Sequence, residues 1–339
     1  MNESADEHII LAHGGGGELT KQLLSERILP KLGNDLLNPL TDGAILGVST
    51  DKICMTTDAY VVQPLEFPGG DIGCLAVCGT VNDLAVMGTR PVALSLALVI
   101  EEGLSFAVLD RIVNSIAAAA KEANVLIATG DTKVIERRKG DGLTITTAGI
   151  GELADGPALD AARIRAGDAV MITGRIAEHG LAVMSAREHL SFETELLSDV
   201  APLHELIQGM IASGADIKFL RDPTRGGLAG VLADLAEDSG LSIEVDEATI
   251  PISPVAHHTA EMLGLDPLTV ANEGKCVAVM PGDDAEKVLD ACRRHPLGEH
   301  AAIIGHFTEA TPPLVELVTR AGGRRMVTRP YGEELPRIC

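Results

Sequence analysis

The sequence contains no tryptophan, two tyrosines and five phenylalanines among its 339 residues. A core of this size must therefore be built from Val, Leu, Ile, Ala and Met. Positive charge is also scarce, because 27 Lys and Arg stand against 49 Asp and Glu, which gives a net charge of −22. Such a surface repels phosphate backbones and anionic lipids. We therefore expect no nucleic-acid partner and no membrane partner.

Cysteine is sparse, and no CxxC pair occurs among the six, which disfavours a zinc ribbon or a thioredoxin-like centre. Cys74 and Cys78 are four residues apart on an expected helix. They could bind a metal together or serve as small buried hydrophobic residues. The longest uncharged apolar run, residues 91–100, is about half a membrane span, and the acidic start is unlike a targeting peptide. These features favour a cytoplasmic protein.

The standard nucleotide-binding motifs are missing. Gly274-Lys275 is followed by Cys276 and lacks the upstream glycine of a Walker A motif, and Leu19 occupies the last position of a GxGxxG pattern. A run of glycines does occur at residues 14–17, between His13 and Glu18. Such a run either closes backbone N–H groups over phosphates or acts as a flexible linker.

Strand and helix patterns alternate along the chain and predict a mixed α/β (α+β) fold of two domains. The turn-rich stretch at residues 151–157 marks the boundary between them. We expect an N-terminal segment (1–41), an N-terminal domain (42–155), a C-terminal domain (160–328) and a flexible tail (329–339). Expected strands are 44–49, 53–57, 92–100, 125–129, 143–150, 169–173, 241–245, 275–280, 301–307 and 314–319. Expected helices are 72–87, 106–123, 178–188, 204–212, 227–236, 255–263 and 284–295.

Several acidic residues stand in turns or at element ends, where an aspartate most often caps a helix or closes a turn. They are Asp42, Asp58, Asp83, Asp131 and Asp222. Asp83 differs from the others, because its helix is otherwise lined by Ala, Val and Met. An unpaired carboxylate there would be costly. Mg²⁺ would remove that cost, and it commonly bridges carboxylates to substrate phosphates.

Two further polar segments precede buried elements. Arg225-Gly226-Gly227 leads into a helix, so its free amides and the guanidinium form a plausible anion site. Glu273 lies in a compact turn before a strand, where it is either an ordinary loop acid or a reactive group. The chain ends in Cys339, at the tip of ten residues that can extend roughly 33–36 Å. This thiol is either a mobile carrier or the inert end of a disordered tail.

Taken together, these segments resemble one superfamily, the aminoimidazole-ribonucleotide-synthetase-like (PurM-like) ATP enzymes. The segments that carry the resemblance are residues 42–44, Thr57-Asp58, 82–88, 130–133 and 222–228. Within that superfamily, the His-Gly-Gly-Gly-Gly-Glu loop, Asn272-Glu273-Gly274 and the Pro-Arg-Ile-Cys ending are typical of HypE proteins, the carbamoyl dehydratases of hydrogenase maturation. The similarity extends from His13 to Cys339.

The resemblance implies a chemistry and its partners. A carbamoyltransferase, HypF, would load a carbamoyl group onto Cys339, and ATP with Mg²⁺ would drive its dehydration to a thiocyanate. The cyanide would pass to iron on a HypC–HypD complex during [NiFe] hydrogenase maturation. The family also implies a homodimer whose N-terminal sheets pair across a twofold axis.

The resemblance also implies roles for individual residues. Glu273 would be the general base, Lys133 would steady the developing oxyanion, and His13 could shuttle a proton. The residues implied for Mg²⁺ are Asp42, Asp83 and Asp222. Those implied for the nucleotide are Gly14, Gly15, Gly16, Gly17, Asp58, Asn82, Gly130, Asp131, Thr224, Arg225 and Gly226.

Two other functions remain open. A selenophosphate synthetase shares the Asp motifs but carries a reactive Cys or selenocysteine near its glycine loop, whereas the first cysteine here is Cys54, in an expected strand. A non-catalytic thiol carrier would explain Cys339 and leave Asp83 and Lys133 without a role. Turnover of MgATP would separate a carrier from an enzyme.

Overall fold

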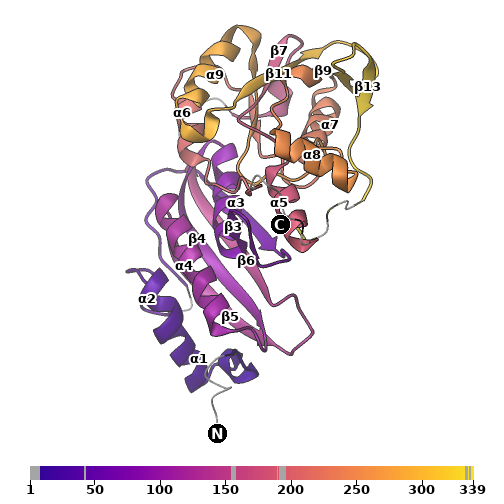
Figure 1. Ribbon diagram of the computed structural model, residues 1–339. Coiled ribbons are helices and arrows are strands. Elements are labelled where there is room, and N and C mark those ends of the chain that lie inside the picture. Colours follow the sequence, from indigo (N-terminus) through magenta and orange to yellow (C-terminus); the bar gives the residue numbers. More distant parts are fainter. Residues whose placement is uncertain are drawn as a thin grey trace.

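The computed structural model describes residues 8–41, 43–153, 158–188, 190, 196–332, 335 and 337–339. Two α/β domains are stacked end to end, with the N-terminal helices at one extreme and the C-terminus next to α5 at the domain junction (Figure 1). Asp42 lies outside the described residues. No helix in the described ranges is both long and apolar enough to cross a membrane.

The N-terminal domain is built on a four-stranded sheet of order β1-β6-β4-β5. Its strands are β1 (Ile53–Tyr60), β4 (Thr89–Glu101), β5 (Leu126–Ile135) and β6 (Leu143–Leu153), beside a small hairpin of β2 (Glu66–Phe67) and β3 (Gly70–Asp71). The helices are α3 (Ile72–Val86) and α4 (Phe106–Glu122), preceded by η1 (Leu11–Gly14), α1 (Glu18–Leu23), η2 (Leu24–Ile28) and α2 (Leu29–Leu32). Asp71 caps α3, because its carboxylate accepts from the backbone N–H groups of Gly73 and Cys74.

The C-terminal domain has a seven-stranded mixed sheet of order β13-β12-β9-β11-β7-β10-β8. Its strands are β7 (Asp168–Ile172), β8 (Phe219–Arg221), β9 (Ser242–Asp246), β10 (Val277–Pro281), β11 (Ala302–Thr308), β12 (Val315–Val318) and β13 (Arg324–Val327). The helices are α5 (Glu178–Arg187), α6 (His204–Ile211), α7 (Gly227–Ser239), α8 (Pro254–Leu263) and α9 (Ala285–Arg293). Short η3 (Ala161–Arg163), η4 (Glu247–Thr249), η5 (Gly282–Asp284) and η6 (Pro296–Gly298) connect them.

Helix α3 joins the two domains. Thirteen of its fifteen residues are buried, and it is apolar on every side. A helix of this kind must be covered all round. Ala85 and Val86, in its last turn, belong to the core that α6, β7 and β10 build. The two domains therefore share one central helix, and its polar residues lie at their junction.

The predicted mixed α/β fold is confirmed, and most predicted elements are present within two or three residues of their expected ends. The strand expected at 44–49 is wrong: residues 44–48 have no regular structure, no described strand pairs with them, and Ile45 is 94% exposed. The alternating pattern alone does not make a strand, because a strand also needs a partner. The helical stretch at 18–32 and the short strands β8 and β13 were not predicted.

Candidate active site

Two acidic side chains meet between β1 and α3. Thr56, on the helix-facing side of β1, donates from Oγ1 to Oδ2 of Asp83 at 2.8 Å. The hydroxyls of Tyr60 and Thr80 donate to Oδ2 of Asp58 at 3.2 and 3.4 Å. Asp58 lies close enough to Asp83 to help raise the pKa of that carboxyl. The sequence positions them because alternate residues of β1 face α3.

The C-terminal domain adds a third carboxylate to this pair. Burial, followed by repulsion from Asp222 and Asp58, raises the pKa of Asp83 to about 7. Burial also raises the pKa of Asp222 to about 6, and Asp58 contributes to the increase. Closely spaced carboxylates cannot all ionise cheaply. The cluster therefore carries a charge that a bound cation would offset.

Mg²⁺ fits the chemistry of this cluster in part. Its oxygen donors are those that Mg²⁺ prefers, and Mg²⁺ usually takes one or two protein carboxylates together with substrate phosphates. In the part of the chain that the structure describes, no group of three or more His, Cys, Asp and Glu side chains is placed to hold a metal ion. Asp83 and Asp222 thus remain predicted ligands that would act together with phosphate oxygens.

Glu273 is held in its turn by the carboxylate of Asp199. The backbone N–H groups of Glu273 and Gly274 donate to Asp199 at 3.2 and 3.3 Å, and Nζ of Lys275 lies 3.2 Å from the same carboxylate. A Cβ at Gly274 would lie 1.8 Å from the carbonyl oxygen of Asp199, so only glycine fits there. The turn is therefore rigid, and it points the Glu273 side chain inward.

The Glu273 carboxyl contacts the end of the chain. It is 2% exposed, and burial, together with Asp222, Asp199 and Asp58, raises its pKa well above the usual value. A hydrogen bond with Cys339 opposes that rise. Oε1 of Glu273 has no hydrogen-bond partner within the described residues. A buried acid with an unused oxygen thus lies against the terminal thiol.

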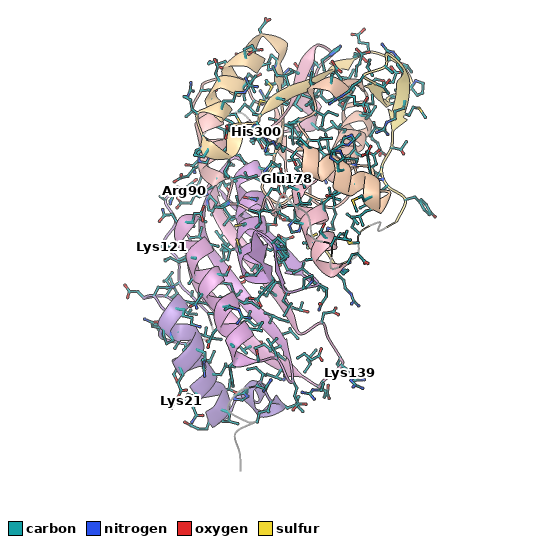
Figure 2. All side chains as sticks on the ribbon, viewed as in Figure 1. Lys21, Arg90, Lys121, Lys139, Glu178 and His300 are labelled. Carbon is teal, nitrogen blue, oxygen red and sulfur yellow. The ribbon has the colours of Figure 1, made fainter. Side chains whose placement is uncertain are left out.

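The described residues of the tail are docked in the junction between the domains. Ile338 is 3% exposed and packs into the core of the N-terminal domain, and its carbonyl oxygen lies 3.0 Å from Nε2 of His179. Arg187 and the N–H of Gln63 donate to the carbonyl of Arg337 at 2.8 and 3.2 Å. Glu178, at the start of the same helix as His179, lies at this junction (Figure 2).

A cavity of about 400 Å³ opens beside Cys339. Arg225 and Gly226 line it together with the tail. Gly226 has a φ of 79° and precedes α7 as its N-cap, a conformation that glycine adopts without strain. Thr224 is half-buried just before them, and its carbonyl accepts from Gly227. The predicted anion-binding segment therefore lies next to the thiol.

Asn82 has a structural position. Its Nδ2 donates to the carbonyls of Ala201 and Glu273 at 3.0 and 2.9 Å, and its Oδ1 accepts from the N–H of Leu203 at 2.7 Å. The side chain is 1% exposed. Asn82 therefore fastens α3 to the Glu273 turn and to the start of α6, and its contact with a nucleotide stays a prediction.

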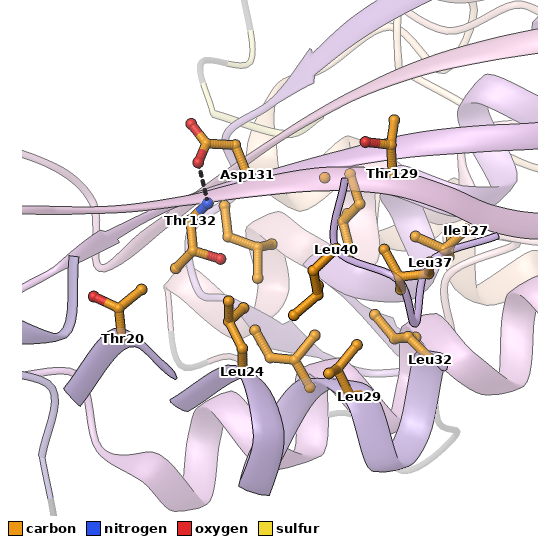
Figure 3. A pocket seen from close by; sticks show the side chains of 14 residues that line it. Thr20, Leu24, Leu29, Leu32, Leu37, Leu40, Ile127, Thr129, Asp131 and Thr132 are labelled. Carbon is orange, nitrogen blue, oxygen red and sulfur yellow. Dashed lines mark hydrogen bonds between the residues drawn. The ribbon is translucent and has the colours of Figure 1, made fainter. Parts of the chain in front are cut away.

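The remaining predicted residues gather at the other edge of the sheet. Asp58, Thr147, Leu96 and Gly130 form one row across the four strands, so β5 lies three strand spacings, about 14 Å, from β1. Asp131 and Lys133 are exposed on β5, on the face away from α3. Figure 3 shows Asp131 and Thr129 on the opposite side of the strand from the leucines of a pocket beneath it.

The glycine run lies on this same edge. Gly14 approaches β5 so closely that a Cβ would lie 2.3 Å from the backbone nitrogen of Val134. Gly15, Gly16 and Gly17 are exposed, and Gly16 and Gly17 have open space around them. His13 is buried, accepts at Nδ1 from the N–H of Ile10, and contacts Phe106 edge to face. One chain therefore does not bring these residues to Glu273 and Cys339.

Three residues of the junction were not found by sequence reasoning: His179, Ser198 and Asp199. Their contacts reach residues 19 to 159 positions away. A histidine in the first turn of a helix, or an aspartate before a proline-containing segment, has no local pattern that marks such a role. Only the folded chain reveals it.

Comparison with known proteins agrees with this architecture. Residues 40–153 match the N-terminal domain, and residues 165–314 the C-terminal domain, of AIR synthase related proteins. Carbamoyl dehydratase HypE of Bradyrhizobium diazoefficiens is 49% identical over 330 residues, 97% of this chain and 95% of that protein.

Solved structures give the same result. A crystal structure of the hydrogenase maturation protein HypE in complex with ATP superposes with a TM-score of 0.94 at 42% identity, over 97% of this chain and 99% of that one. A chain of a HypE–HypF complex superposes with a TM-score of 0.80 at 44% identity, over 93% and 100%. These likenesses extend over both domains, so the chain belongs to the HypE family of carbamoyl dehydratases.

Proposed function

We propose that this protein uses ATP to dehydrate a carbamoyl group carried on Cys339, forming a protein thiocyanate. The observation that carries this proposal is the hydrogen bond between the terminal thiol and the buried carboxyl of Glu273. An inert chain end would not require a buried contact between its thiol and a carboxyl group. The thiocyanate would supply the cyanide ligand of a [NiFe] hydrogenase.

The reaction needs the carbamoyl oxygen to leave, and it leaves easily only as phosphate. Transfer of the γ-phosphoryl group to that oxygen releases ADP, and one nitrogen proton is lost as the C=N bond forms. Loss of phosphate with the second nitrogen proton then gives S–C≡N. In the loaded protein the carbamoyl nitrogen replaces the thiol hydrogen as the donor nearest to Glu273. Glu273 would take the second of these protons, as phosphate leaves, and a carboxylate with a raised pKa is a stronger base for it.

The acid cluster supports the role proposed for the nucleotide. Mg²⁺ would neutralise phosphate charge during the transfer. Asp83 and Asp222 would hold it, with Asp42 as the third ligand, while Asp58 accepts hydrogen bonds that fix the cluster. Arg225 offers positive charge beside Cys339, whereas the N–H groups of Gly227 and Ala229 at the start of α7 already donate to backbone carbonyls.

A second copy of the chain would bring the remaining residues. Among the described strands, none pairs with the outer side of β1, and Ile53 and Met55 on it are 53% and 68% exposed. Edge strands and exposed apolar residues of this kind favour association. In a homodimer, the glycine run with Asp131 and Lys133 of one copy could face the cluster of the other. Lys133 would then steady the oxygen as phosphate is transferred.

The proposed partners follow from membership of the HypE family, of which one member is solved in complex with HypF. HypF would load the carbamoyl group, and the HypC–HypD complex would accept the cyanide on iron. A thiol carrier without catalysis has no use for half-buried carboxylates whose pKa values are raised to about 7 and about 6. A selenophosphate synthetase needs a reactive thiol beside its glycine loop, and the described cysteines nearest the N-terminus, Cys54 and Cys74, lie on β1 and α3.

The test replaces the thiol and follows the tail by mass. Wild-type protein incubated with HypF, carbamoyl phosphate and MgATP should gain a cyano group in place of hydrogen on its C-terminal peptide. Cys339→Ala should fold, bind MgATP and gain no cyano group, while Cys54→Ala should behave like the wild type. A cyano group found elsewhere in Cys339→Ala would contradict the proposal.

A further inference from the structure

His179 is a buried side chain whose role is not explained by the acid cluster. It is fully buried, and both ring nitrogens have partners: Nδ1 lies 2.8 Å from Oγ of Ser198, and Nε2 lies 3.0 Å from the carbonyl oxygen of Ile338. We propose that His179 is a positioning residue that seats the Cys339 thiol against Glu273, and that Ser198 selects the tautomer required. This deepens the proposed function and rests on it.

The hydrogen bonds determine where the ring proton lies. A carbonyl oxygen only accepts, so Nε2 of His179 must carry the hydrogen that reaches Ile338. Oγ of Ser198 accepts from the N–H of Val200 at 3.1 Å, which leaves its own hydrogen free to donate to Nδ1. Burial lowers the pKa of His179, so the ring stays neutral. Ser198 thus holds the ring as the Nε2–H tautomer.

The carbonyl that His179 binds is the last one before the reacting residue. Fixing Ile338 leaves only the few bonds of Cys339 between the anchor and the sulfur. Phe67 contacts the ring edge to face, with centroids 5.4 Å apart, and prevents it from turning. Small displacements of a reacting group cost rate steeply. The anchor therefore sets the position of the thiol.

The anchor and the base are supported by the same two short segments. Ala177, before α5, has a φ of 72°, and its N–H donates to Oδ1 of Asn272 at 2.7 Å, directly before Glu273. Ser198 orients His179, and the next residue, Asp199, binds the amides of Glu273 and Gly274. A shift of either segment would move the thiol and the acid together.

Two substitutions at one position separate this role from simple core packing. His179→Gln would keep a donor near the Nε2 position, whereas His179→Leu fills the space without one. We expect iodoacetamide to label Cys339 about 2- to 10-fold faster in His179→Leu, the range for loss of one hydrogen bond. Single-turnover dehydration of carbamoyl-loaded protein should slow by at least a similar factor. MgATP affinity should not change. In His179→Gln, the labelling rate and the dehydration rate should both return most of the way to the wild-type values.

Two further variants complete the experiment: one tests the role of Ser198, and the other is a control. Ser198→Ala removes only the hydroxyl, so it should speed labelling in the same direction by a smaller factor. His204→Leu removes another histidine that is 8% exposed, at the start of α6, and should leave labelling as in the wild type. Labelling needs no carbamoyl group. The positioning of Cys339 by His179 can therefore be confirmed even if no thiocyanate ever forms. The proposal is overturned if Cys339 is labelled at the wild-type rate in both His179→Leu and Ser198→Ala. It is also overturned if His179→Gln and His179→Leu change the labelling and dehydration rates equally.

Discussion

The two edges of the N-terminal sheet differ in how complete they are. At β1, Asp58 and Asp83 lie with Asp222, Glu273 and Cys339, all from distant parts of the chain. At β5, the glycine run and two charged side chains are exposed, with no described segment from the C-terminal domain over them. One edge holds a cluster of acidic side chains assembled around the terminal thiol, and the other is a surface.

The difference separates two tasks. The proposed bond-breaking chemistry would require a fixed environment shielded from water, and the buried turn of Glu273 offers one beside β1. Phosphate groups arrive and leave, so the residues predicted to meet them can remain open until the nucleotide binds. Substitutions at the two edges should therefore fail in different ways.

The largest effect is expected from Asp83→Asn. It removes one charge and one predicted Mg²⁺ ligand from a site that must offset phosphate charge, so measurable MgATP binding should disappear. Isothermal calorimetry of the folded variant measures this directly. The matched change at the other edge, Asp131→Asn, removes one exposed contact and should weaken binding only about 2- to 10-fold.

An Asp83→Asn protein that binds MgATP as the wild type does would show that the carboxylate is not part of the nucleotide site. Equal losses in the two variants would instead show that both edges contribute alike. Either result would end the distinction between an assembled edge and an open one.

The next effect is expected from Glu273→Gln. Glutamine has nearly the same shape but cannot take a proton, so dehydration should slow by about 10²–10⁴. Carbamoyl loading and MgATP binding should continue. Rapid-quench single-turnover measurements on loaded protein test this, because they isolate dehydration from loading. An unchanged rate would reduce Glu273 to a loop acid.

Lys133→Ala should block an earlier step of the reaction than Glu273→Gln does. Lys133 is predicted to act on the oxygen during phosphoryl transfer, before any proton reaches Glu273. ADP release in a single turnover should therefore fail in Lys133→Ala, whereas Glu273→Gln should still release ADP. If both variants release ADP at the wild-type rate, Lys133 has no role in the transfer.

A mixing experiment tests whether the two edges meet across a dimer. Asp83→Asn and Lys133→Ala proteins are each expected to be inactive. In a mixed dimer, one site would combine the intact Asp83 of one copy with the intact Lys133 of the other. Random pairing should then restore about a quarter of the wild-type activity. Activity that stays at the level of the separate variants after subunit exchange would place both residues in one chain's site.

The fold was largely predictable from the sequence because most elements are specified locally. Alternation on β1 and 3.6-residue spacing on α4 need no knowledge of distant segments. Residues 44–49 have the pattern of a strand but no partner within the described chain, so the strand predicted there does not form. The helical stretch at 18–32 was missed because the π-helical turn η2 separates two short helices, α1 and α2, and Pro30 lies within α2, so no long 3.6-residue pattern marks it.

The site was predictable only in part. Asp83 and Asn82 are neighbours in sequence; Asp83 is predicted to hold Mg²⁺ and Asn82 to hold the nucleotide. Successive residues of a helix point about 100° apart, so Asp83 faces β1 while Asn82 faces the C-terminal domain. The contact of Cys339 with Glu273 depends on His179 and Asp199, which no local pattern marks. Long-range polar contacts are the part of the site that only the fold determines.

The smallest expected effect concerns stability and pH. The pKa of Asp83 is raised from 3.8 to about 7 in the folded protein, so between these values the folded state binds more protons than the unfolded state. The contribution of Asp83 to the free energy of unfolding is therefore largest below pH 3.8 and is lost as the pH rises to about 7. Asp222, with a pKa of about 6, acts in the same direction. The nucleotide-free protein should be less stable at about pH 8 than at about pH 5.

Asp83→Asn should lessen this loss. Three pKa units would correspond to at most about 4 kcal/mol, but the carboxyl is only partly buried and solvent screens it, so about 1–2 kcal/mol is expected. The melting temperature of the variant at about pH 8 should then exceed that of the wild type by several degrees, with a smaller difference at about pH 5, where part of the loss has already occurred. The protein's net charge of −22 also favours low pH, so only the difference between variant and wild type is informative. Asp131→Asn, an exposed carboxylate at the other edge, is the control and should follow the wild-type curve. Parallel curves for Asp83→Asn and wild type would mean that the assembled edge holds no repulsion for Mg²⁺ to relieve.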